Sequence, residues 1–145
     1  MLHHIEIYVS DFEKTAAFWG WLLEEELGYA PYQSWDNGAF DCGKSWRNGS
    51  HYLVFVQTKE KYLKDSYNRT RTGLNHLAFH GRDRAHIDEL AEKLEKRGTA
   101  LLYQERFPHA GGAGSYAVYF EDPDRIKVEI VAPEDVAQKD KQEGL

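Results

Sequence analysis

Three residues carry side chains that together could hold a catalytic divalent metal: His4, His76 and Glu129. His4 and Glu129 lie in segments that alternate apolar and polar residues, as a half-buried strand does, and both stand on the polar side. His76 lies in a segment, 74–79, that matches the strand of His4, so it is expected to point the same way. Taken singly, each is better explained as a polar side chain on the solvent-exposed face of a strand. If the strands belong to one curved sheet, their polar sides meet in a cavity. Two imidazoles and one carboxylate then form a facial metal site with open positions.

An internal repeat in the sequence favours a shared role for His4 and His76 over a chance placement. His4 and His76 lie 72 residues apart, as do Asp11 and Asp83, and each aspartate directly precedes a helical pattern. In the first half, a strand over 4–9 leads to a helix that Ser10 and Glu13 introduce as a capping box. In the second half, a strand over 74–79 leads to a helix from about 84 to 96, with Asp83 as its N-cap.

Three shorter strands follow the helix in each half. In the first half, turn signals at 36–38 and 48–49 separate strands within residues 29–57. In the second half, strands are expected at about 99–104, 115–120 and 125–131, with Asp122-Pro123-Asp124 as the last turn. The polar residues 59–72 connect the halves. The fold class is therefore α+β, with two βαβββ modules at about 2–58 and 74–131 within a single domain, 1–133, and a charged tail, 134–145.

The composition excludes several classes of partner. The chain has 145 residues, enough for one domain with a real core, and a net charge of −6, which disfavours binding to nucleic acid. It has one cysteine, which favours a reducing compartment such as the cytoplasm over a disulfide framework. No apolar run approaches the ~20 residues of a membrane span, and the start is unlike a signal peptide. A small molecule is the expected partner.

The motifs resemble those of the vicinal oxygen chelate superfamily, which includes glyoxalase I, extradiol dioxygenases, fosfomycin-resistance thiol transferases and bleomycin-resistance proteins. The resemblance covers residues 2–131 and rests on His4 with Val9 and Asp11, on Leu74-Asn75-His76-Leu77-Ala78-Phe79, and on Tyr119-Phe120-Glu121-Asp122-Pro123-Asp124 followed by Lys127-Val128-Glu129. It implies a cup-shaped mixed sheet with the helices outside. It places His4, His76 and Glu129 on the ligand positions of a divalent metal: nickel, zinc, manganese or iron.

One expected ligand is missing. Members that resemble glyoxalase I carry a fourth ligand, a carboxylate, on the last strand of the first half, where this chain offers Gln57 or Phe55, depending on the alignment. A three-ligand site is closer to the dioxygenases and the thiol transferases. Glu6, two residues from His4 on the same strand face, is the candidate for proton transfer.

The leading hypothesis is a metal-dependent lyase, isomerase or dioxygenase whose metal chelates vicinal oxygens of a small substrate. The alternative is a metal-free binding protein like the bleomycin-resistance proteins. Thiol transfer of the fosfomycin type is weaker, because Glu6 stands where those proteins look small and polar.

A homodimer is also expected, because members of the superfamily commonly pair and because open sheets expose edges. The first helix also carries more large apolar side chains than one buried stripe can hold, and the surplus indicates an interface. These side chains are Trp19, Trp21, Leu22 and Leu23.

Overall fold

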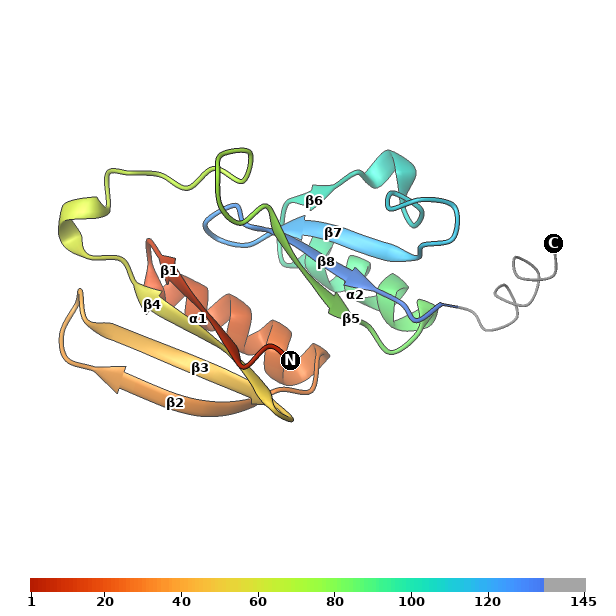
Figure 1. Ribbon diagram of the computed structural model, residues 1–145. Coiled ribbons are helices and arrows are strands. Elements are labelled where there is room, and N and C mark those ends of the chain that lie inside the picture. The colour runs from red at the N-terminus through yellow and green to blue at the C-terminus, as the bar shows by residue number, and fades with distance from the viewer. Residues whose placement is uncertain (135–145) are drawn as a thin grey trace. The chain divides into compact units, whose positions relative to one another are not determined.

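The computed structural model describes residues 1–134 as two compact units, each built around its own four-stranded mixed sheet (Figure 1). The first unit contains Met1–Asn68 and Asp122–Arg125, and the second contains Arg69–Glu121 and the described residues from Ile126 onward. The predicted α+β class with two βαβββ modules is confirmed. The predicted charged tail, 134–145, lies outside the described residues from 135 onward.

In the first unit the strands are arranged in the order β1-β4-β3-β2. The pair β1–β4 is parallel, as the helix crossover between them requires, and the other pairs are antiparallel. Helix α1 packs on β3 and β4. The elements are β1 (His4–Val9), α1 (Phe12–Gly20), the π-helical η1 (Trp21–Glu26), β2 (Ala30–Asp36), β3 (Cys42–Asn48) and β4 (His51–Gln57).

Helix α1 begins one residue later than the capping-box motif suggests. The N-cap is Asp11, whose carboxylate accepts a hydrogen bond from the backbone N–H of Lys14 at 3.2 Å. Ser10 serves another purpose, since its backbone N–H donates to Asp124 Oδ2 at 3.0 Å and its hydroxyl also bonds to that carboxylate. The prediction of Ser10 as N-cap was wrong by one position.

Aromatic and leucine side chains form the core of this unit. The ring of Trp19 stacks on Phe55 with centroids 4.8 Å apart, and its indole N–H donates to Asp122 Oδ2 at 3.0 Å. Leu22 and Leu23 are fully buried. They can both face inward because the helix widens there to i→i+5 hydrogen bonds, such as that from Leu27 N to Leu22 O at 3.1 Å. Trp19, Leu22 and Leu23 are therefore core residues and supply no interface, whereas Trp21 is half-buried.

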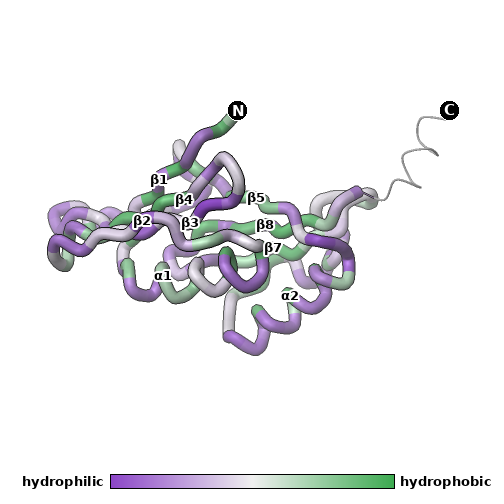
Figure 2. The backbone as a smooth tube through the Cα atoms, turned by 90° about the horizontal axis from the view of Figure 1, so that it is seen from below, coloured by the Kyte–Doolittle hydropathy of each residue, from purple (hydrophilic) through white to green (hydrophobic). Residues whose placement is uncertain are grey.

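In the second unit the order is β5-β8-β7-β6, with β5 parallel to β8. Asp83 caps α2 as predicted, accepting from His86 N at 2.7 Å. Hydrophobic and hydrophilic positions alternate along α2 (Figure 2), and its buried stripe faces the sheet. The elements are β5 (His76–His80), α2 (Arg84–Lys96), β6 (Leu101–Leu102), β7 (Ala117–Glu121) and β8 (Lys127–Val131); the 3₁₀ turns η2 (Glu60–Tyr62) and η3 (Gln104–Arg106) lie in the first and second units.

The closing strands are shorter than the sequence pattern predicts. The strand expected over 99–104 is reduced to Leu101–Leu102, because Tyr103 adopts a left-handed conformation with φ of 57°. The strand expected from 125 begins at Lys127, because Arg125, with φ of 65°, still belongs to the preceding turn. None of the helices within residues 1–134 has the length and apolarity needed to cross a membrane.

Candidate metal centre

His76 and Glu129 come together on the sheet of the second unit. Their strands β5 and β8 are parallel neighbours, and the Nε2 atom of His76 lies 3.4 Å from Oε2 of Glu129. Val128 and Ile130, which flank Glu129, are fully buried, so that Glu129 points to the face away from α2. The strand alternation predicted from the sequence thus holds for Glu129.

Asn75 determines which nitrogen of His76 is available. The amide nitrogen of Asn75 donates to the carbonyl oxygen of Arg69 at 3.1 Å, which fixes the amide orientation. Its Oδ1 atom then accepts from Nδ1 of His76 at 2.8 Å. A neutral imidazole that carries its proton on Nδ1 presents a lone pair on Nε2. When the imidazole is neutral, Nε2 and the Glu129 carboxylate are two acceptors 3.4 Å apart, an arrangement that a cation between them would stabilise.

Tyr119 completes this part of the site. It stands opposite Glu129 in the β7–β8 register, and its hydroxyl hydrogen-bonds to that carboxylate. Burial of the phenol, together with the bond to Glu129 and its charge, raises the pKa of Tyr119 to about 12. The hydroxyl is therefore a donor that holds the Glu129 carboxylate in place.

His4 belongs to the first unit, on strand β1. Its Nδ1 atom lies 2.8 Å from Nδ1 of His3, and its ring is stacked on Tyr52 with centroids 4.6 Å apart and planes 3° apart. Glu6 lies on the same exposed side of β1, as the alternation predicts. Among the residues that the structure describes, no three His, Cys, Asp or Glu side chains gather closely enough to hold a metal ion.

The strand register corrects the assignment of the fourth ligand position. Glu129 pairs with Ala78, two residues after His76, and the corresponding partner of Glu6, two residues after His4, is Val54. Phe55 is fully buried in the core, so it faces away from this position. Val54, a side chain without a donor atom, therefore occupies it.

Gln57 has a structural role at the start of α1. Its Oε1 atom accepts from Phe12 N at 2.9 Å, and its Nε2 atom donates to the carbonyl oxygens of Ser10 at 2.9 Å and Thr58 at 3.3 Å. Because Gln57 is 6% exposed and its amide is satisfied by these backbone groups, it is not available as a ligand. Both candidates considered from the sequence were misaligned, by one and by three residues.

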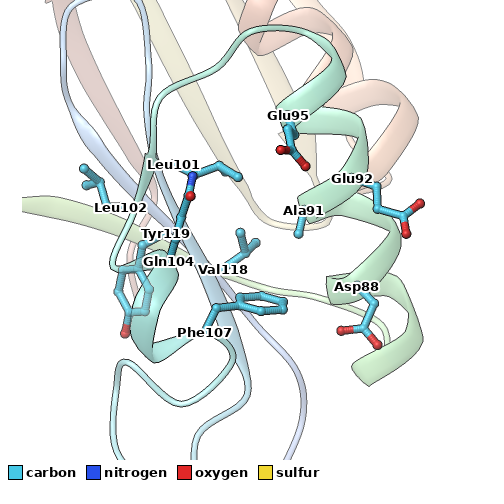
Figure 3. Close-up of a pocket in the computed structure, with 10 residues that line it drawn as sticks. All are labelled: Asp88, Ala91, Glu92, Glu95, Leu101, Leu102, Gln104, Phe107, Val118 and Tyr119. Carbon is cyan, nitrogen blue, oxygen red and sulfur yellow. The ribbon is translucent and has the colours of Figure 1, made fainter.

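A pocket of about 460 Å³ lies on the other side of this unit, between α2 and the segment from β6 to Phe107 (Figure 3). Carboxylates of α2 line one wall and apolar side chains from β6, β7 and Phe107 line the other. Neither His76 nor Glu129 lines it, but Tyr119, whose hydroxyl bonds to Glu129, does.

Asn75 and Tyr119 stand in the motifs quoted above, but their bonds to His76 and Glu129 do not follow from those motifs. The sequence offered two signals: Asn75 is the neighbour of His76, and Tyr119 alternates with the buried residues Val118 and Phe120, which puts its polar hydroxyl on the opposite face of the strand.

The chain consists of two βαβββ units. The first strand of each unit carries a histidine, and the last strand of the second unit carries the carboxylate of Glu129. This combination defines a class of protein. The chain belongs to the Glyoxalase/Bleomycin resistance protein/Dioxygenase superfamily, whose family model matches residues 3–120.

Two relatives cover nearly the whole chain. The chain is 54% identical to the uncharacterized protein YqjT of Bacillus subtilis over 132 residues, which span 91% of this chain and 98% of YqjT. A crystal structure of a putative glyoxalase from Bacillus halodurans is 56% identical, with a TM-score of 0.86 over 92% of this chain and 96% of that one.

Fosfomycin-resistance proteins are more distant. The glutathione transferase FosA of Serratia marcescens is 27% identical over 89% of this chain and 78% of FosA. A crystal structure of a mutant of FosX from Listeria monocytogenes, complexed with Mn(II) and 1S,2S-dihydroxypropylphosphonic acid, shares the fold, with 22% identity and a TM-score of 0.64 over 96% of both chains.

Proposed function

We propose that the protein is a metal-dependent enzyme, a lyase, isomerase or dioxygenase, that acts on a small substrate with neighbouring oxygens. His4, His76 and Glu129 would hold a divalent nickel, zinc, manganese or iron ion, and Glu6 would transfer a proton. The single observation that carries this proposal is the contact of His76 Nε2 with Glu129 Oε2 at 3.4 Å, with Nδ1 of the histidine already engaged by Asn75.

The donor set suits such an ion. Imidazole nitrogen and carboxylate oxygen are ligands that borderline divalent metals accept, and the outer nitrogen of His76 is fixed by a hydrogen bond, as metal-binding histidines usually require. When bound, the metal supplies Lewis-acid stabilisation of negative charge on a substrate oxygen. FosX, which shares the fold, holds Mn(II) in its complex.

In this proposal Glu6 is the residue that moves a proton. It lies on the β1 face of His4, and its register partner is the apolar Val54. Within residues 1–134 no hydrogen bond or ion pair engages its exposed carboxylate, which would leave it open to a substrate C–H or O–H group. We further propose that the protein acts as a homodimer in the cytoplasm.

Metal titration tests the proposal. Chelator-treated wild type should bind at least one of Mn²⁺, Ni²⁺, Zn²⁺ or Fe²⁺ by calorimetry and gain thermal stability from it. Glu129→Gln keeps the size and removes the charge, and should weaken binding by about 10–100-fold or more, the range for loss of outer-sphere partners alone. Glu89→Gln, on the exposed face of α2, is the matched control and should behave as wild type.

Indifference of the wild type to all four metals would overturn the proposal and favour the metal-free binder. In that case Glu129→Gln should change the free energy of unfolding by less than about 0.5 kcal/mol, as a surface substitution does.

A further inference from the structure

Two cationic side chains gather around Tyr103 on the sheet of the second unit. The Nζ atom of Lys127 lies 3.3 Å from the Tyr103 hydroxyl and 5.5 Å from its ring centroid, and the guanidinium carbon of Arg106 lies 4.9 Å from the same centroid. Lys127 precedes Glu129 by two residues on β8, so both side chains emerge on the same face. We refer to Tyr103, Arg106 and Lys127 as the Tyr103 cluster.

The charges of this cluster are poorly compensated. The register places Glu121 beside Lys127, but the Glu121 carboxylate pairs with Arg69 at 2.9 Å. Lys127 consequently has no carboxylate within ion-pair distance among residues 1–134. In the described part of the chain, the one ion pair of Arg106 is with its exposed sequence neighbour Glu105, at 3.5 Å. The chain as a whole carries a net charge of −6, so that a general surplus of cations does not explain this concentration.

The backbone holds the cluster in an unfavourable conformation. Tyr103 adopts φ 57° and ψ 33°, a left-handed conformation that is unfavourable for a residue other than glycine. Such outliers are concentrated in ligand-binding segments. The strained turn brings the Tyr103 ring to 5.3 Å from the ring of Tyr119, whose hydroxyl bonds to Glu129. The cluster is thus continuous with the candidate metal centre through one aromatic contact.

We propose that the Tyr103 cluster is an oxyanion subsite, and that the substrate of this site carries a carboxylate, phosphate or phosphonate group. This inference rests on the proposed function, because it makes the subsite part of the same active site. The Lys127 ammonium and the Arg106 guanidinium donate charge-assisted hydrogen bonds to the anion, and the Tyr103 hydroxyl donates a third. Anchoring one end of the substrate in this way orients its remaining oxygens toward His76 and Glu129.

Binding of simple anions tests the inference. Methylphosphonate, inorganic phosphate and acetate are titrated separately into wild type, with and without Mn²⁺, and followed by calorimetry or by chemical shifts. At least one should bind saturably, and Lys127→Met should weaken it by roughly 10-fold or more, the effect of losing a hydrogen bond to a charged group. Comparing the three probes distinguishes a tetrahedral from a planar anion.

Two further variants separate the role in binding from a role in packing. Lys127→Arg keeps the charge and should restore most of the affinity. Lys96→Met removes the same charge from the exposed face of α2 and should leave affinity unchanged. Equal affinities of Lys127→Met and Lys96→Met, or no saturable binding of any probe to wild type, would overturn the inference.

The metal titration is independent of these outcomes. Binding of metal without binding of any anion would refute the subsite and leave the proposed enzyme standing. Anion binding that depends on Lys127, in a protein that binds no metal, would refute the proposed metalloenzyme while confirming that the cluster takes an oxyanion.

Discussion

Replacing Asn75 by Ala should weaken metal binding without unfolding the protein. The substitution removes the acceptor that lies 2.8 Å from Nδ1 of His76. The imidazole can then place its proton on Nε2 instead, which is a form that cannot bind a metal through that atom. Loss of such an outer partner costs about 10–100-fold in affinity, which corresponds to ~1.4–2.7 kcal/mol of binding free energy.

Two other asparagine variants make this test specific. Asn75→Asp keeps an acceptor, and its charge makes the imidazole a stronger ligand, so its affinity should equal or exceed that of wild type. Asn48→Ala changes an exposed asparagine of β3 and serves as the matched control. The assay is competition for Mn²⁺ or Zn²⁺ against a chelating dye, with thermal melting of the metal-free proteins measured in parallel. Equal metal affinity of Asn75→Ala and Asn48→Ala would refute the role of Asn75.

Three other substitutions have defined outcomes. Gln57→Leu should lower the free energy of unfolding by about 2 kcal/mol, because buried backbone groups lose their partner, while metal affinity per folded molecule stays unchanged. The raised pKa of Tyr119 stabilises the folded wild type fully below pH 10, and this contribution to the free energy of unfolding is lost as the pH rises from 10 to about 12. Tyr119→Phe removes the titrating phenol, so its free energy of unfolding should fall less steeply over this pH range. Asp122→Ala should cost about 1–3 kcal/mol in chemical denaturation, because the buried indole N–H of Trp19 loses its acceptor.

The order of elements in both units could be predicted because their polarity patterns are periodic. Alternation along 4–9 and 126–131 correctly gave the exposed side of His4 and Glu6 and the outward face of Glu129. The second helix and its Asp83 cap also followed from local signals, which depend on neighbouring residues alone.

The errors arose where geometry depends on distant partners. The register of β4 against β1 decides between Val54 and Phe55, and an alignment by hydrophobicity cannot detect a shift of one residue in a strand as uniformly apolar as 52–56. The widened helical turn after Gly20 was likewise hidden, because it depends on how Leu22 and Leu23 pack. The bonds of Asn75 and Tyr119 to the site depend on side-chain orientation, which no spacing reveals.

The assignment of Asp122–Arg125 to the first unit has a consequence for how the chain folds. Trp19 and Ser10 find acceptors on Asp122 and Asp124, more than 100 positions later in the sequence. A fragment that ends at Asn68 lacks both carboxylates and must bury an indole N–H without a partner. During synthesis the first unit therefore cannot reach its final structure until most of the second has left the ribosome. Two modules that look separable as a sequence repeat should consequently unfold together, in one cooperative transition.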